Sequence, residues 1–259
     1  MGCDAQFRWP RPGEAGGGAG AGPAGADDPE AAPAGRSGGR GGCRGGDGLG
    51  ARAVIQTIDD EAALRRGAAA LVALEPRFAP AVAIGLPLRP RTNGFAELFS
   101  TIVYQQVSMA SAQAVWTRCE AAGLTTGAAL AAATDEALRA VGLTRPKQRA
   151  GRALAAADMD FAALERMPDD EALARLMALH GVGPWTAQVY ALFALRRADI
   201  LPAGDVALQE GARSLFGLGQ RPDAAALSRM AKAWAPWRSV AARALWVYRL
   251  RETGRETVW

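Results

Sequence analysis

From Ala51 onward, the apolar residues of this 259-residue chain recur at spacings of three and four, and almost no stretch alternates with a period of two. The clearest case begins at Phe95, which Leu98, Phe99 and Ile102 follow. This spacing places apolar side chains on one face of an α-helix, whereas a half-buried strand needs alternation. A chain of this length also buries a sizeable core. We therefore expect an all-α architecture, with helices in two lobes on either side of a cleft.

Capping residues, prolines and glycines predict where the helices begin and end. Thr134 precedes two acidic residues and Gly142 follows the same apolar segment, which is typical of an N-cap and a C-terminal glycine. Pro146 marks the start of the next helix. Signals of this kind predict about nine helices, over residues 59–74, 95–119, 134–142, 147–157, 168–179, 184–196, 205–216, 223–234 and 237–251.

The first 50 residues differ in composition, because 31 of them are glycine, alanine or proline. Such a segment buries too little apolar surface to offset the entropy lost on ordering. We expect a disordered tail over residues 1–50 and a helical domain over residues 51–259. Two alternatives stay open for the tail: the Gly/Arg tract at residues 36–44 is a weak phosphate-binding arm, or translation starts near Ala51.

Charge and rare residue types exclude several classes of protein. Residues 51–259 carry 25 basic and 20 acidic side chains, a balance that permits a nucleic-acid partner. The single histidine, His180, excludes sites that need two histidines, and three cysteines cannot supply a Cys₄ zinc site or a four-cysteine iron–sulfur cluster. No apolar run approaches the ~20 residues that a membrane span needs. We expect a soluble cytoplasmic protein with no membrane partner.

The most informative stretch is Leu-His-Gly-Val-Gly-Pro-Trp-Thr-Ala at residues 179–187, where one predicted helix ends and another begins. Gly181 and Gly183 permit positive φ angles and a close approach of the backbone to a partner. Free N–H groups at the start of the second helix bind phosphate without reading base sequence. Taken alone, this pattern is more typical of a tight helix–helix turn.

A second motif, Leu-Pro-Ala-Gly-Asp, ends at Asp205, twenty residues after Trp185. Asp205 stands where the next helix should start. The simplest interpretation is an ordinary N-cap that stabilises the helix by ~1 kcal/mol. Taken in isolation, Asp205 favours this capping interpretation.

Together, the hairpin motif and the later Pro-x-Gly-Asp resemble the helix-hairpin-helix (HhH-GPD) base-excision DNA glycosylases. Residues 95–109 are similar to the family's helix and loop that carry two glutamines and a serine, and residues 142–147 resemble its segment before the hairpin. Residues 234–239, with Trp246 beyond them, look like the C-terminal helices of the 3-methyladenine DNA glycosylase II branch. The resemblance covers about residues 53–251 and implies a two-lobed fold with a DNA-binding cleft.

The resemblance implies a monofunctional glycosylase that flips alkylated purines of the 3-methyladenine type out of duplex DNA and leaves an abasic site. Asp205 matches the family's catalytic acid, whose carboxylate stabilises the oxocarbenium-like sugar. Bifunctional members carry a Schiff-base lysine where this chain has Trp185, so no lyase activity is expected. Trp185 and Trp246 match aromatic residues that stack on a cationic base. Tyr190 is a further pocket candidate, one residue away from the branch's usual tyrosine.

The same resemblance implies contacts with DNA and with an ion. Gln106 matches the residue that fills the gap left by the flipped nucleotide, while Tyr104 stands where many relatives have glycine. The other candidate DNA contacts are Gly181, Val182, Gly183 and Thr186 in the hairpin, and Lys147 at the start of a helix. Family hairpins often hold a monovalent cation on backbone carbonyls, which here belong to Met177, Leu179 and Val182.

The sequence departs from the resembled family in two ways: it lacks the four-cysteine cluster of some members, and we expect the N-terminal β-rich domain of the longer alkylation enzymes to be absent or vestigial. We expect Trp234 and Trp237 to lie in the core, whereas Arg238 fits a phosphate contact or a salt bridge equally well. We also expect a monomer. Two alternative functions stay open: the same fold acting on oxidised or deaminated bases, and a non-catalytic DNA-binding module.

Overall fold

The computed structural model describes residues 55–254, and within this part the chain is helical, as expected. The described residues form no sheet; one isolated β-bridge pairs Thr57 with Arg197. The predicted tail and the alternatives for its Gly/Arg tract lie outside the described residues and stay predictions. The α-helices are α1 (Glu61–Leu74), α2 (Ala79–Val82), α3 (Phe95–Val103), α4 (Met109–Ala121), α5 (Gly127–Ala132), α6 (Asp135–Ala140), α7 (Arg145–Ala156), α8 (Phe161–Arg166), α9 (Asp169–Met177), α10 (Pro184–Phe193), α11 (Val206–Leu215), α12 (Ala224–Met230) and α13 (Arg238–Thr253).

Polar N-caps define where most of these helices begin. In each case, a side-chain oxygen accepts a hydrogen bond from a backbone N–H in the first turn, which otherwise lacks a partner inside the helix. The residues that cap in this way are Asp60, Ser108, Thr126, Thr134, Asp160, Asp205 and Asp223. The predicted start at Thr134 is therefore confirmed, and Gly142 has the positive φ, +91°, expected of a glycine after a helix.

The single helix predicted over residues 95–119 is wrong, because the structure has two helices there. α3 ends at Val103 and α4 begins at Met109. Between them Gln106 has a φ of +56°, which a right-handed helix does not allow, and Ser108 caps α4. Apolar spacing continues across the break because both helices bury side chains. Helices α2, α5 and α8 were also missed, because segments of four to six residues are too short to show a distinct apolar face.

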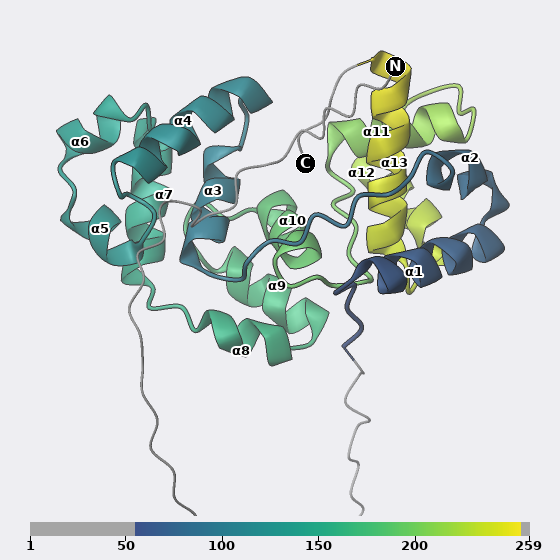
Figure 1. The fold of residues 1–259 in the computed structure, drawn as a ribbon, viewed down its shortest axis with the longest axis horizontal. Coiled ribbons are helices and arrows are strands. Elements are labelled where there is room, and N and C mark those ends of the chain that lie inside the picture. Colours follow the sequence, from purple (N-terminus) through teal and green to yellow (C-terminus); the bar gives the residue numbers. More distant parts are fainter. Residues whose placement is uncertain (1–54, 255–259) are drawn as a thin grey trace, which may run out of the picture. The chain divides into compact units, whose positions relative to one another are not determined.

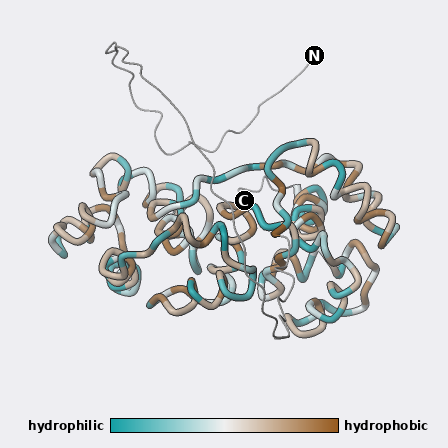
Figure 2. The backbone as a smooth tube through the Cα atoms, turned by 90° about the horizontal axis from the view of Figure 1, so that it is seen from below, coloured by the Kyte–Doolittle hydropathy of each residue, from teal (hydrophilic) through white to brown (hydrophobic). Residues whose placement is uncertain are grey.

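The helices form two lobes, which lie side by side in Figure 1. In the first lobe, which contains α3–α10, α7 packs against α3 and α5, and α10 packs against α3 and α9. The second lobe contains α1, α2 and α11–α13, with α13 packed against the other long helices. Hydrophobic and hydrophilic residues are interspersed along the helices (Figure 2): α1 buries one face, whereas α3, α10 and the first half of α13 are buried on nearly all sides.

Three contacts lie where the end of α10 and the loop that follows it meet α13. The Phe193 ring stacks on the Trp246 ring with centroids 5.8 Å apart. The Ser239 hydroxyl accepts from the Ile200 N–H and also contacts the Ile200 carbonyl, both at 3.0 Å. Arg238 donates to both carboxylate oxygens of Asp199 at 2.7 Å, so the salt-bridge interpretation of Arg238 is the one realised.

The second lobe has its own aromatic core. Trp234 is buried, as expected, and its ring packs on the rings of Phe78 and Phe216 at centroid distances of 5.1 and 5.7 Å. Trp237 is half-buried and packs against the hydrophobic core of the described residues, with its ring beside Gly67 of α1. The edge-to-face and stacked geometries of these rings add to the stability gained from area burial.

The close approach of α11 to α13 depends on Gly211. A Cβ added to Gly211 would lie 2.4 Å from the carbonyl oxygen of Leu245. We expect Gly211→Ala to lower the free energy of unfolding by about 1–3 kcal/mol, because overpacking outweighs alanine's helix preference. A Cβ on Gly219 meets nothing within 4 Å, so Gly219→Ala should change it by less than about 0.5 kcal/mol. Urea unfolding of both variants checks this, and equal midpoints would contradict the close contact.

Candidate functional site

The turn between α9 and α10 needs glycine at one of its two glycine positions. Gly181 has a φ of +85°, and a Cβ added there would lie 2.4 Å from the Cβ of Ala150 on α7. Gly183 has a φ of −89°, so this residue does not use the positive φ that glycine permits. Nothing lies within 4 Å of a Cβ placed on Gly183. The first glycine therefore shapes the hairpin, and the second leaves open space beside it.

The start of α10 lies beside this open space. No side chain caps α10, and Gly183 and Pro184 are exposed. The first N–H groups of an α-helix have no partner within the helix and carry its positive dipole end. Of the predicted hairpin contacts, Val182 and Thr186 are buried. An anion at the hairpin would therefore meet mainly backbone.

Asp205 is the N-cap of α11 and also the meeting point of two indoles. Its Oδ1 accepts from the Leu208 N–H at 3.0 Å and from Trp246 Nε1 at 3.2 Å, and its Oδ2 accepts from Trp185 Nε1 at 2.9 Å. Asp205 is only 5% exposed. An ionised carboxylate accepts hydrogen bonds without donating any, which suits this surrounding of three N–H donors. The capping interpretation is correct, and the two indole contacts go beyond it.

The three predicted pocket aromatics lie in different surroundings. Trp185 is half-buried and lines a cavity, whereas Trp246 is buried against Phe193 with its N–H on Asp205. Tyr190 is buried elsewhere, where its hydroxyl contacts Asn93 and accepts from the Gly94 N–H at 2.8 Å. One residue along a helix is a rotation of about 100°, which turns Tyr190 toward the core instead of the cavity.

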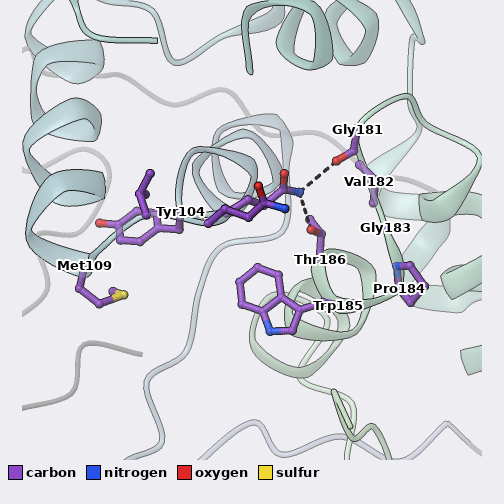
Figure 3. A pocket seen from close by; sticks show the side chains of 11 residues that line it. Tyr104, Met109, Gly181, Val182, Gly183, Pro184, Trp185 and Thr186 are labelled. Carbon is purple, nitrogen blue, oxygen red and sulfur yellow. Dashed lines mark hydrogen bonds between the residues drawn. The ribbon is translucent and has the colours of Figure 1, made fainter. Parts of the chain in front are cut away.

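The cavity has a volume of about 610 Å³ and lies between the α3–α4 loop and the hairpin (Figure 3). Its size falls in the range of small-molecule pockets. Tyr104 lines it, donating from its hydroxyl to Gln113 Oε1 at 2.8 Å, and burial raises the pKa of Tyr104. The full lining comprises Tyr104, Gln105, Gln106, Val107, Met109, Gly181, Val182, Gly183, Pro184, Trp185 and Thr186.

Two predicted DNA contacts lie near the end of α3: Gln106 on the α3–α4 loop and Lys147 on α7. Gln106 is exposed at the turn of the loop, in the left-handed conformation. Lys147, on α7, donates from Nζ to the carbonyl oxygen of Val103 at 2.6 Å, and burial lowers the pKa of this amine. Lys147 therefore holds the C-terminal end of α3 in place.

Sequence reasoning missed Gln105, although it singled out the adjacent Gln106. The Gln105 amide nitrogen donates to the Gly181 carbonyl at 3.0 Å and to Thr186 Oγ1 at 2.6 Å, the dashed lines of Figure 3. This side chain ties the α3–α4 loop to the hairpin. The pair of glutamines after an apolar helix was the available signal, but nothing in the sequence placed it opposite the hairpin.

Within residues 55–254, no group of three or more His, Cys, Asp or Glu side chains is placed to hold a metal ion. The Leu179 carbonyl accepts from the Val182 N–H at 3.1 Å, which leaves it one lone pair. No helix in residues 55–254 is both long and apolar enough to cross a membrane.

Comparison with known proteins gives one family. The model of the HhH-GPD superfamily base excision DNA repair protein matches residues 99–237. An alkylbase DNA glycosidase-like protein, mag2 of Schizosaccharomyces pombe, is 36% identical over 83 residues. The matched stretch makes up 32% of this chain and 39% of the length of that relative.

Two solved structures resemble the fold over most of their length. DNA-3-methyladenine glycosidase of Bacillus halodurans has a TM-score of 0.64 and 31% identity, covering 77% of this chain and 94% of that one. The 3-methyladenine DNA glycosylase Mag1 of Schizosaccharomyces pombe, solved with abasic DNA, has a TM-score of 0.62 and 25% identity, covering 70% and 95%.

The hairpin glycines offer a matched pair of substitutions. We expect Gly181→Ala to lower the free energy of unfolding by about 2 kcal/mol or more, because a Cβ there requires a left-handed backbone and overlaps Ala150. We expect Gly183→Ala to stay within about 0.5 kcal/mol of the unmodified protein. Urea denaturation measures both, and a destabilised Gly183→Ala variant would show that its surroundings are not open.

Proposed function

Since the chain belongs to the HhH-GPD superfamily of base excision DNA repair proteins, we propose that it is a monofunctional DNA glycosylase for alkylated purines of the 3-methyladenine type. Residues 51–259 form the glycosylase domain. The observation that carries the proposal is the pair of indole N–H groups from Trp185 and Trp246 that converge on Asp205, next to the cavity at the hairpin. The names of the similar proteins support the substrate class.

Duplex DNA binds across the hairpin and the α3–α4 loop. The uncapped N–H groups at the start of α10 hold a phosphate, and the open space at Gly183 lets the strand approach the backbone. The exposed side chain of Gln106 fills the gap in the duplex. The damaged nucleotide leaves the stack, and its base enters the cavity against Trp185. These contacts favour an unstacked nucleotide and do not depend on the base sequence.

Asp205 acts on the sugar of the flipped nucleotide. The glycosidic C1′–N bond breaks with its electron pair going to the base, and a cationic alkylated purine thereby leaves as a neutral molecule. The remaining oxocarbenium-like sugar is stabilised by the Asp205 carboxylate, in a water-poor site where charge interactions are strong. Water then adds at C1′ and loses its proton, assisted by the same carboxylate. The two indoles hold Asp205 in position for both steps.

Trp185 also limits the reaction to hydrolysis. A lyase needs an amine that attacks C1′ and forms a Schiff base, and an indole nitrogen is not such a nucleophile. Cutting of the abasic strand therefore falls to another activity. Stacking of the electron-rich indole on a cationic base favours alkylated purines over neutral ones.

The remaining components of the proposal are modest. The chain's three cysteines do not make a four-cysteine cluster, and the chemistry above needs no cofactor. The carbonyls of Met177, Leu179 and Val182 are neutral oxygen donors, which suit a structural monovalent cation. One chain carries the whole site, so we propose a monomer that works on DNA in the cytoplasm.

The first test removes the charge of Asp205. We expect the purified protein to release 3-methyladenine from methylated DNA and Asp205→Asn to be at least about 100-fold slower, because a preorganised charge beside the reacting sugar is lost. Chromatography of the free base measures the rate, and thermal unfolding confirms that the variant folds. On a gel, the unmodified protein should break strands only after alkali.

Other outcomes of that experiment separate the alternatives. Release of oxidised or deaminated bases in place of 3-methyladenine would show that the substrates are not alkylated purines. Binding of damaged DNA without release of any base would favour a binding module. Strand cleavage without alkali would contradict the monofunctional reaction.

A second test removes one donor to Asp205. We expect Trp185→Phe to keep the aromatic wall and to slow base release about 10- to 100-fold, since a hydrogen bond to a charged group contributes roughly 1.5–3 kcal/mol. Trp116→Phe is the matched control, because Trp116 donates to Glu120 at 2.9 Å within α4 and lies outside the cavity lining. Single-turnover kinetics with both variants measures the effect. Equal rates for the two variants would refute an orienting role for Trp185.

A further inference from the structure

Gln105 is unusual among the residues of the cavity, because both hydrogens of its amide group have acceptors in the protein. One hydrogen lies on the Gly181 carbonyl and the other on Thr186 Oγ1. These two acceptors belong to the hairpin, whereas Gln105 directly follows α3. The backbone of Gln105 therefore belongs to the α3–α4 loop, while its amide group is held by the hairpin. The residue lines the cavity between these two elements.

The Gly181 carbonyl determines which way the amide of Gln105 points. A carbonyl oxygen only accepts hydrogen bonds, so the group that faces it must be the NH₂ and not the side-chain oxygen. The orientation of a glutamine amide is often ambiguous, because its two terminal atoms look alike. Here the ambiguity is removed, and Oε1 is the atom that is left for another partner.

The side-chain oxygen of Gln105 has no hydrogen-bond donor among residues 55–254. The other polar side chains of the lining have different geometry. Tyr104 directs its hydroxyl to Gln113, and Gln106 is exposed at the turn of the loop. Much of the remaining wall is apolar, with Val107, Met109 and Trp185. A fixed acceptor in such a wall favours a ligand that brings an N–H donor to this point.

We propose that Gln105 determines base specificity, with its Oε1 accepting a hydrogen bond from the 6-amino group of an alkylated adenine in the cavity. This inference rests on the proposed function. The positive charge of an alkylated adenine makes its amino group a stronger donor. A 6-oxo purine presents a carbonyl at the same place, and a purine without a 6-substituent presents nothing, so each leaves the oxygen of Gln105 unpaired. The site thus prefers adenine-derived damage to deaminated bases.

The experiment compares two free bases that differ only in the amino group, 3-methyladenine and 3-methylpurine. Titration calorimetry with the full chain should show at least about tenfold tighter binding of 3-methyladenine, the effect of about one hydrogen bond. Gln105→Met removes the acceptor and should bring the two affinities within about threefold. Gln113→Met is the matched control: Gln113 accepts from Tyr104 beside the cavity but does not line it, so the preference should persist.

A conservative variant separates recognition from the structural bridge. Gln105→Glu loses both N–H donors but keeps acceptor oxygens, one of which can take the Thr186 hydroxyl while the other faces the base. We expect this variant to keep the preference for 3-methyladenine even if its unfolding midpoint falls. If Gln105 only bridges the loop to the hairpin, Gln105→Glu and Gln105→Met should both lose affinity, and the loss should be the same for the two bases.

The remaining outcomes all decide the question. Equal affinity of the unmodified protein for the two bases, failure to bind 3-methyladenine, or a preference that survives Gln105→Met would overturn the assignment of Gln105. Base release from methylated DNA is measured in parallel. Absence of release refutes the proposed function itself, whereas normal release without discrimination refutes only the role of Gln105.

Discussion

The carboxylate of Asp205 receives N–H donors from three helices: Trp185 on α10, Trp246 on α13 and the backbone of Leu208 on α11. α10 belongs to one lobe and the other two helices belong to the second. This buried group therefore lies where the lobes meet, and its position is correct only when both lobes are correctly placed. The stacking of Phe193 on Trp246 and the ion pair of Arg238 with Asp199 hold that junction on either side.

The all-α class, the hairpin and the N-cap at Asp205 could be read from the sequence, because each depends on local signals. Spacing of apolar residues, a polar N-cap and a glycine after a helix all act within a few residues of the chain. The spacing of apolar residues missed the break between α3 and α4, because Gln106 adopts its left-handed conformation without being a glycine. A non-glycine residue with positive φ leaves no compositional trace.

The details of the candidate site depended on contacts between segments far apart in the chain, which local patterns do not encode. Trp185 and Asp205 are twenty residues apart and touch, and Trp246 joins them from forty-one residues further on. Gln105 reaches the hairpin across more than seventy residues. The bond from Lys147 to the carbonyl at the end of α3 likewise joins segments that are forty-four residues apart. Tyr190 faces the core because the direction of a helical side chain changes with every residue.

Trp185 belongs to two structures at once, since it is part of the cavity wall and a hydrogen-bond donor to Asp205. Its ring cannot tilt to admit a bulkier guest without lengthening the bond from Nε1 to the carboxylate. The size of base that the cavity admits and the alignment of the Asp205 carboxylate therefore depend on the same side chain. Relatives that accept larger bases would have to support the carboxylate from another direction, so widening of the cavity and rearrangement around the aspartate should occur together in evolution.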